Sequence, residues 1–90
     1  MTDAKQAIHS KIVELARQLG NNARGLRCDE EIPATGLLDS ASLMELIVWF
    51  ETRYGLSIEQ GELTLENFGT VDAMVSFLER NSASGQGATR

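Results

Sequence analysis

The sequence predicts a small all-α fold, a four-helix bundle of three main helices and a short third helix, with a long loop between the first and second helices. Several segments repeat apolar residues at the three- and four-residue interval of a helix. Only the stretch GLSIE alternates like a strand, and it has no second strand to pair with. A chain of 90 residues with 42% hydrophobic residues supports one domain with one modest core.

The first helix is expected over residues 3–19, and Gly20 ends it. About 20 residues without a helical period follow, a length typical of functional loops. Pro33 prevents an ordinary helix from continuing through this loop. Three apolar residues could pin the loop to the bundle: Leu26, Ile32 and Leu37.

The second helix is expected over residues 40–54 and the short third helix over residues 64–68. The last helix begins at Thr70, whose hydroxyl can cap it. Its apolar positions at helical spacing are Val71, Met74, Val75 and Leu78. Residues 82–90, SASGQGATR, have nothing to bury and are expected to form a disordered tail, so residues 1–81 form the folded domain.

The second helix is more apolar than a core-facing helix requires. One stripe is sufficient for the core and consists of Leu43, Leu46, Ile47, Phe50 and Tyr54. A second strip carries Ala41, Met44 and Val48, and Trp49 lies on a further side. A chain this small cannot surround such a helix, so we expect part of this surface, with Glu45 beside it, to bind a partner protein. Alternatively, the long loop covers Met44 and Val48, or Trp49 packs on the first helix.

The charge of the chain is acidic overall and uneven. The formal net charge is -5, and residues 29–79 hold eleven acidic residues against Arg53 alone. Such a field favours basic protein partners and disfavours nucleic acid and anionic lipid. The same surface charge could also serve only to keep the domain soluble.

No feature of the chain directs it out of the cytoplasm. It contains no apolar run of transmembrane length, and the N-terminal stretch MTDAKQAIHSK lacks the apolar block of a signal peptide. Cys28 is the only cysteine, so no internal disulfide is possible and a reducing compartment fits. We therefore expect a cytoplasmic protein.

Asp39 and Ser40 stand at the start of the second helix, where either could cap it. As a nucleophile Ser40 would need a base, but the only histidine is His9, and no glycine-flanked nucleophile elbow is present. Cys28 with His9 is a weak pattern, and no metal-binding spacing occurs, so we expect no catalytic and no metal-ligating residues. An exposed hydroxyl at a helix N-terminus would, however, tolerate a phosphodiester.

The segment GLLDSASLMELIVWFETRYGLSIEQGELTLENFGTVDAMVSFLER resembles the carrier proteins of fatty acid, polyketide and nonribosomal peptide synthesis. The likeness consists of Asp39 and Ser40 opening a helix, Glu45, an aromatic-glycine end of that helix, a short third helix and Thr-Val opening the last one. It implies that Ser40 receives a 4'-phosphopantetheine arm from coenzyme A. A separate phosphopantetheinyl transferase adds the arm, and Asp39 assists its recognition. The arm's thiol holds cargo as a thioester, and the carrier itself is no enzyme.

The same resemblance assigns Ala41, Met44, Glu45 and Val48 to the partner-binding face, and we add Trp49, which is unusual at its position. The partners implied are the transferase, a loading enzyme and a downstream acceptor enzyme, with the carrier itself a monomer.

The form Leu-Leu-Asp-Ser, residues 37–40, resembles D-alanyl carriers and stand-alone aminoacyl carrier proteins more than fatty acid carriers, and the stretch ELTLENFGTVDAM is similar to the stand-alone aminoacyl carriers. Class II seryl-tRNA synthetase-like amino acid:carrier protein ligases load those carriers. We therefore expect an aminoacyl cargo. An acyl carrier of fatty acid or polyketide synthesis and an unmodified helical protein-binding adaptor are the alternatives.

Overall fold

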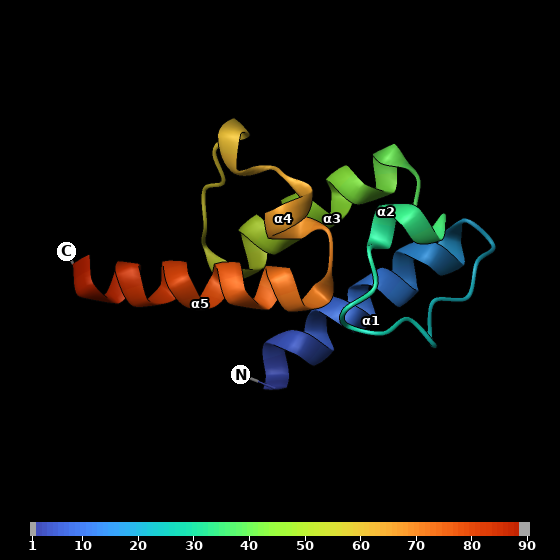
Figure 1. Cartoon of the computed structure of the whole chain (residues 1–90), viewed down its shortest axis with the longest axis horizontal. Helices are drawn as coiled ribbons and strands as arrows, with labels where there is room; N and C mark the ends of the chain where they lie inside the picture. The colour runs from blue at the N-terminus through green and yellow to red at the C-terminus, as the bar shows by residue number, and fades with distance from the viewer. Residues whose placement is uncertain (1, 89–90) are drawn as a thin grey trace.

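The computed structural model describes the backbone of residues 2–88 and the side chains of residues 4–81. Three long helices form the frame: α1 (Thr2–Gln18), α3 (Ser40–Tyr54) and α5 (Val71–Ala88) (Figure 1). Helices α2 (Ile32–Thr35) and α4 (Leu65–Phe68) are short. A single 3₁₀ turn, η1 (Gln60–Glu62), precedes α4, and residues 2–88 contain no strand. The predicted all-α fold with three main helices is confirmed.

The core lies where α1, α3 and α5 meet, with α4 packed onto α5 (Figure 1). The fully buried side chains of α1 are Ile8, Ile12 and Leu15. An aromatic cluster closes the other side: the ring centroids of Phe68 and Phe77 are 4.8 Å apart, and those of Phe50 and Phe68 are 5.8 Å apart. Edge-to-face and tilted contacts of this kind add to the stabilisation from apolar burial.

Threonine hydroxyls cap the last two helices, and the cap at Thr70 is the one that the sequence predicts. The Thr64 hydroxyl accepts a hydrogen bond from the backbone N–H of Asn67 at 3.2 Å, which starts α4. The Thr70 hydroxyl accepts from the N–H of Ala73 at 2.9 Å, which starts α5. These threonines satisfy backbone donors that a helix leaves unpaired at its first turn.

The long loop between α1 and α3 contains a helix that the sequence analysis did not expect. Helix α2 begins at Ile32 and has Pro33 in its first turn. Proline is compatible with that turn because the first N–H groups of a helix have no partner within the helix. Pro33 therefore stands at the start of a short helix, and the loop on either side of α2 is shorter than predicted.

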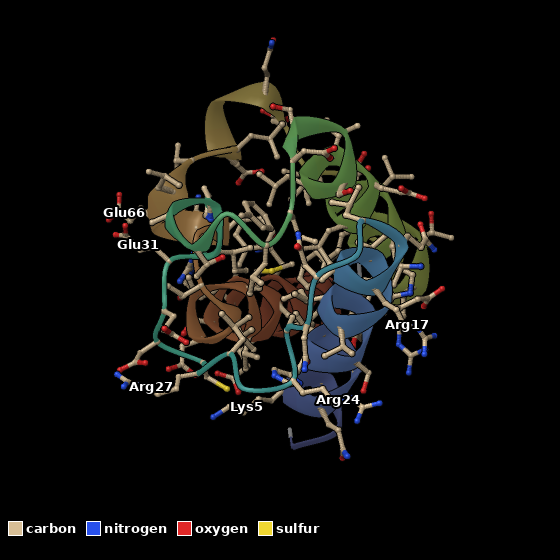
Figure 2. The ribbon with its side chains drawn as sticks, turned by 90° about the vertical axis from the view of Figure 1, so that its right-hand side faces the viewer. Lys5, Arg17, Arg24, Arg27, Glu31 and Glu66 are labelled. Atoms are coloured by element: carbon tan, nitrogen blue, oxygen red, sulfur yellow. The ribbon has the colours of Figure 1, made fainter. Side chains whose placement is uncertain are left out.

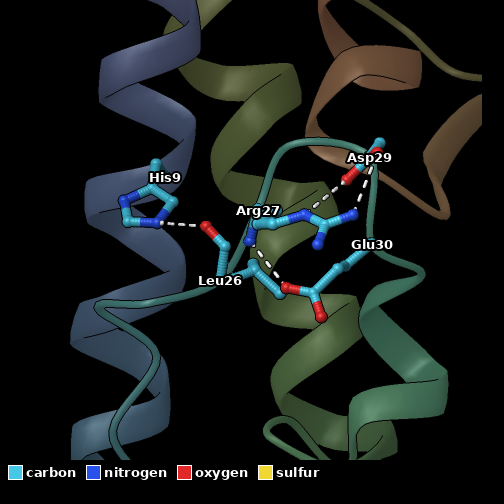
Figure 3. Close-up of polar contacts among 5 residues, drawn as sticks. All are labelled: His9, Leu26, Arg27, Asp29 and Glu30. Atoms are coloured by element: carbon cyan, nitrogen blue, oxygen red, sulfur yellow. Dashed lines mark hydrogen bonds and ion pairs between the residues drawn. The ribbon is translucent and has the colours of Figure 1, made fainter.

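Hydrogen bonds fasten this loop to the bundle (Figure 3). The Nε2–H of His9 on α1 donates to the carbonyl of Leu26 at 3.1 Å. The N–H of Ile32 donates to the carbonyl of Gly69 at 2.7 Å, and the N–H of Asp72 donates to that of Cys28 at 3.0 Å. Of the three predicted apolar anchors, Leu26 and Ile32 are buried and Leu37 is half-buried.

Residues 27–30 form a smaller polar turn within the loop. The guanidinium of Arg27 donates to the carboxylate of Asp29, with Nε 3.2 Å from Oδ1, and the Arg27 backbone N–H donates to Glu30 (Figure 3). The hydrogen bond from Arg27, and then its positive charge, hold the pKa of Asp29 below its ordinary value. Both side chains are exposed, so this pair shapes the turn more than it stabilises the fold.

The last helix runs to Ala88, beyond residue 81, where we expect the folded domain to end. Side chains after Asn81 and residues 89–90 lie outside the described part, so the disorder of the tail stays a prediction. Within the described residues, no helix combines the length and apolarity needed to cross a membrane.

Candidate attachment site

Asp39 and Ser40 have different roles at the start of α3. Asp39 is extended, with φ -93° and ψ -178°, and its Oδ1 accepts a hydrogen bond from the backbone N–H of Ser42 at 2.8 Å. Asp39 is therefore the N-cap, and Ser40 is the first helical residue. The Ser40 side chain is exposed and makes no hydrogen bond to the described residues. Its hydroxyl is thus open to an enzyme.

The charge of Asp39 is set by its role as a cap. The backbone hydrogen bond from Ser42, followed by the Ser42 hydroxyl, lowers the pKa of the Asp39 carboxyl below its ordinary value of 3.8. The group is ionised at neutral pH and lies beside Ser40. A carboxylate at this position also interacts favourably with the positive end of the α3 dipole.

The residues before Ser40 are held in place by side chains around them. Gly36 ends α2 in the left-handed conformation, with φ 73°, which allows the chain to turn toward α3. The Asn21 side-chain amide donates to the carbonyl of Leu37 at 2.9 Å, and Leu38 is buried. These contacts hold the segment before Ser40 against the bundle and so fix the position of Ser40 at its surface.

The predicted partner strip of α3 is open. Met44 is 52% exposed and Val48 is 54% exposed, and Ala41 and Glu45 are also exposed. The alternative that the long loop covers Met44 and Val48 is therefore wrong. The strip begins one residue after Ser40 and follows the same helix.

Trp49 lies outside this strip and is half-buried. Its ring meets that of Tyr54 edge-on at a centroid distance of 6.2 Å, and the Arg53 guanidinium lies 5.8 Å from its centroid. The sequence analysis assigned Trp49 to the partner-binding residues. In the structure much of its surface is used to cover the edge of the core, which leaves it less area for a partner.

Next to Met44 is an apolar groove that sequence reasoning missed. It has a volume of about 230 Å³. Leu43 and Ile47 of α3 form one wall, and the opposite wall includes Leu63 and Leu65, the latter 62% exposed. The sequence contained one indication of this groove, the leucines on either side of Thr64. A segment of three residues cannot bury two leucine side chains by itself, so they need a neighbouring apolar surface.

The structure also places the side chains that were considered for catalysis and metal binding. The described residues contain no cluster of three His, Cys, Asp or Glu side chains able to hold a metal ion. His9 Nε2 is bonded to the Leu26 carbonyl, and Cys28 is half-buried. The structure presents an exposed Ser40 at the first helical residue of α3, beside the exposed strip of Ala41, Met44, Glu45 and Val48.

A family model described as the phosphopantetheine attachment site matches residues 12–78, which extend from α1 into α5. The chain belongs to this family of phosphopantetheine carrier domains. No curated protein gives a significant match to the chain.

Membership defines the prosthetic group and the kind of activity. The domain bears 4'-phosphopantetheine and is a carrier rather than a catalyst. Phosphopantetheinyl transferases modify such carriers, and loading and acceptor enzymes interact with them. The start of α3 fits the group, because the Ser40 hydroxyl is exposed and helix N–H groups favour a phosphate there.

Proposed function

We propose that Ser40 carries the 4'-phosphopantetheine arm and that the protein delivers an aminoacyl group, held on the arm as a thioester, to partner enzymes. The observation that supports this most strongly is the exposure of Ser40 at the first residue of α3, directly after a residue that already caps the helix. The arm supplies a thiol that forms the thioester. The protein supplies the anchor, the direction in which the arm leaves and the surface that partners bind.

Asp39 assists the transferase in this proposal. Its carboxylate is ionised at neutral pH and exposed, so it can attract the transferase or a cation that the transferase holds. Its second role, the cap of α3, keeps Ser40 in place. Replacing Asp39 would therefore affect both the rate of modification and the stability of the helix start.

The partner-binding face consists of Ala41, Met44, Glu45 and Val48, with Trp49 at its edge. Support comes from the exposure of the first four side chains on one side of α3. Two apolar side chains with a carboxylate beside them match the usual composition of an interface, an apolar centre with a polar rim. Methionine adapts to different partner surfaces, which suits a carrier that meets several enzymes in turn.

The aminoacyl assignment rests on residues 37–40, Leu-Leu-Asp-Ser, which resemble those of D-alanyl and stand-alone aminoacyl carriers, and on the stretch ELTLENFGTVDAM, which is similar to that of the stand-alone aminoacyl carriers. A ligase resembling class II seryl-tRNA synthetases would load a small amino acid such as glycine or alanine. One observation favours an acyl cargo as the second candidate. The apolar groove between α3 and the segment around Leu63 and Leu65 could receive a short alkyl chain but offers little to a charged amino group.

Coexpression with a transferase of broad specificity tests the attachment site by intact mass. We expect wild type and Ser57→Ala, a control at another exposed serine, to gain the mass of one phosphopantetheine, and Ser40→Ala to gain none. An increment that persists in Ser40→Ala would place the arm elsewhere. A wild-type chain that gains nothing would instead support the adaptor alternative.

The modified protein then distinguishes the cargo. Incubation with ATP, glycine or alanine and the loading ligase should add the mass of one aminoacyl group, which is the amino acid less water, and hydroxylamine should remove it because it cleaves thioesters. Loading by acyl-transferring enzymes alone would favour the acyl carrier. In that case methyl NMR signals of Leu63 and Leu65 should shift with the length of the acyl chain.

A further inference from the structure

A second cavity lies at the C-terminal end of α1, away from the apolar groove. It has a volume of about 220 Å³ and is lined by Val13, Arg17, Asn21, Asn22 and Arg24. Val13 provides an apolar floor, and the other four side chains provide a polar rim. Two guanidinium groups in one cavity are unexpected on a chain of net charge -5.

Arg17 and Arg24 differ from the neighbouring cations because no acidic side chain of the described residues pairs with them. Three other cations of the same region are paired: Lys5 with Asp72 at 3.4 Å, Lys11 with Glu14 at 3.6 Å and Arg27 with Asp29 at 3.2 Å. The two arginines of the cavity therefore keep their full capacity for charge-assisted hydrogen bonds.

The two asparagines add donors and a link to the attachment site. Asn22 Oδ1 accepts from the backbone N–H of Arg24 at 3.0 Å, which holds Arg24 at the rim and leaves the Asn22 amide N–H groups available. Asn21 donates to the carbonyl of Leu37, three residues before Ser40. The cavity thus offers the Arg17, Arg24 and Asn22 donors to an anion, and Asn21 joins it to the segment that presents the serine.

The cavity lies at the end of the molecule that carries Ser40. In Figure 1 the C-terminal end of α1 and the first turn of α3 lie at the same end of the bundle. Figure 2 views that end directly: Arg17 lies on the right and Arg24 below the centre, whereas Glu31 and Glu66 lie on the left, with Arg27 below them. Arg27 is paired with Asp29, so the guanidinium groups of Arg17 and Arg24, unpaired among the described residues, lie away from the two glutamates.

We propose that the Arg17–Arg24 cavity binds aspartate or glutamate side chains of the enzymes that dock at Ser40, and so fixes their orientation. A guanidinium pairs with a carboxylate through two parallel hydrogen bonds. The net charge of -5 weakens the binding of a free anionic peptide without abolishing it at a site of two guanidinium groups. A carboxylate on a protein already held by α3 is at high local concentration and overcomes that repulsion. The orienting role rests on the proposed attachment at Ser40, whereas carboxylate binding does not.

An NMR titration of the unmodified, full-length ¹⁵N-labelled protein tests the proposal at low ionic strength. The probe is an acetylated and amidated tetraglutamate peptide, and the readout is the side-chain amide of Asn22. We expect saturable shifts. In the double variant Arg17→Gln/Arg24→Gln the affinity should fall by about fivefold or more. Lys5→Gln/Arg80→Gln removes the same charge outside the cavity and should retain the affinity within about twofold.

Three results would overturn the proposal. The first is the absence of saturable shifts at Asn22, and the second is an equal loss of affinity in both double variants. The third is tighter binding of inorganic phosphate than of the peptide, which would make the cavity a phosphate site. Spectra of both variants must show the dispersion of the folded protein. None of these results depends on the modification of Ser40, so a failed mass experiment and a failed titration are separate outcomes.

Discussion

At the scale of single residues, the neighbours Asp39 and Ser40 have separate roles at the start of α3. Either Asp39 or Ser40 could have capped the helix, and the structure gives the cap to Asp39. A carboxylate reaches the N–H of Ser42 from its extended backbone position, so the serine hydroxyl is not needed for the cap. This division makes Ser40 available without weakening the helix that holds it.

The cap leads to a prediction about pH. The pKa of Asp39 is lower in the folded than in the unfolded protein, so its ionised form stabilises the fold above the unfolded value. That contribution is lost as the pH falls through the folded value. Asp39→Asn keeps an acceptor oxygen but cannot titrate. We therefore expect wild type to lose more thermal stability than Asp39→Asn between about pH 7 and about pH 2.5.

Circular dichroism melts at the two pH values measure this difference. Asp39→Ala serves as the comparison, because it removes both the cap and the charge and should have the lowest Tm of the three at neutral pH. The lowered pKa of Asp29 affects the pH dependence of all three proteins alike, so it cancels when their Tm values are compared. If the difference between wild type and Asp39→Asn did not shrink in acid, the cap would not depend on the ionised carboxylate.

At the scale of the elements, α4 depends on the glycine that ends it. A Cβ on Gly69 would overlap the carbonyl oxygen of Leu65, which also accepts the Gly69 N–H. The carbonyl of Gly69 in turn accepts from Ile32, so α4 cannot move without disturbing α2. The short helices thus support each other, although neither has many residues of its own in the core.

We expect Gly69→Ala to lower the free energy of unfolding by about 1–3 kcal/mol, the usual cost of forcing an extra methyl group into a packed site. Gly61→Ala is the matched control, because a Cβ there meets nothing within 4 Å. Urea denaturation of both variants measures the effect. Equal stability of the two variants would mean that α4 relaxes at little cost.

Sequence reasoning was accurate for α1, α3 and the short α4, but it missed α2 and η1. Helix α3 spans residues 40–54 as predicted, because its apolar period, its cap and Gly55 all agree. Helix α2 was not predicted because four residues are too few to show a helical period of apolar residues. Its proline is also equally compatible with a loop. Phe77, buried in the aromatic cluster, was also absent from the predicted apolar positions of the last helix.

At the scale of the whole molecule, the surface separates charges of opposite sign around one end. The acidic residues that follow residue 28 give α3 and the segment beside it a negative field, whereas Arg17 and Arg24 form a positive site on α1. A field of this kind guides diffusional encounter and disfavours wrong orientations. The open apolar strip of α3 would then supply the contact area.

We expect Glu45→Lys to slow loading by the partner ligase at low salt by about threefold to tenfold, since rim charges mainly change the association rate. The effect should diminish at about 0.5 M salt because screening weakens long-range attraction. Glu79→Lys, a charge reversal at another exposed glutamate, on α5, is the control and should have little effect. Loading rates at two salt concentrations provide the measurement. If both reversals slow loading equally, net charge rather than the α3 face governs encounter.

The all-α class, the three long helices, the acidic surface and the candidacy of Ser40 could be predicted from the sequence. The reason is that periodicity, caps and local motifs depend on residues that are close together along the chain. The tertiary structure alone decided which side of α3 stays open and where the apolar groove lies. It also brought Arg17 of α1 together with Arg24 of the loop. These features depend on how distant segments pack against one another, and that packing is fixed only when the loop folds back onto the bundle.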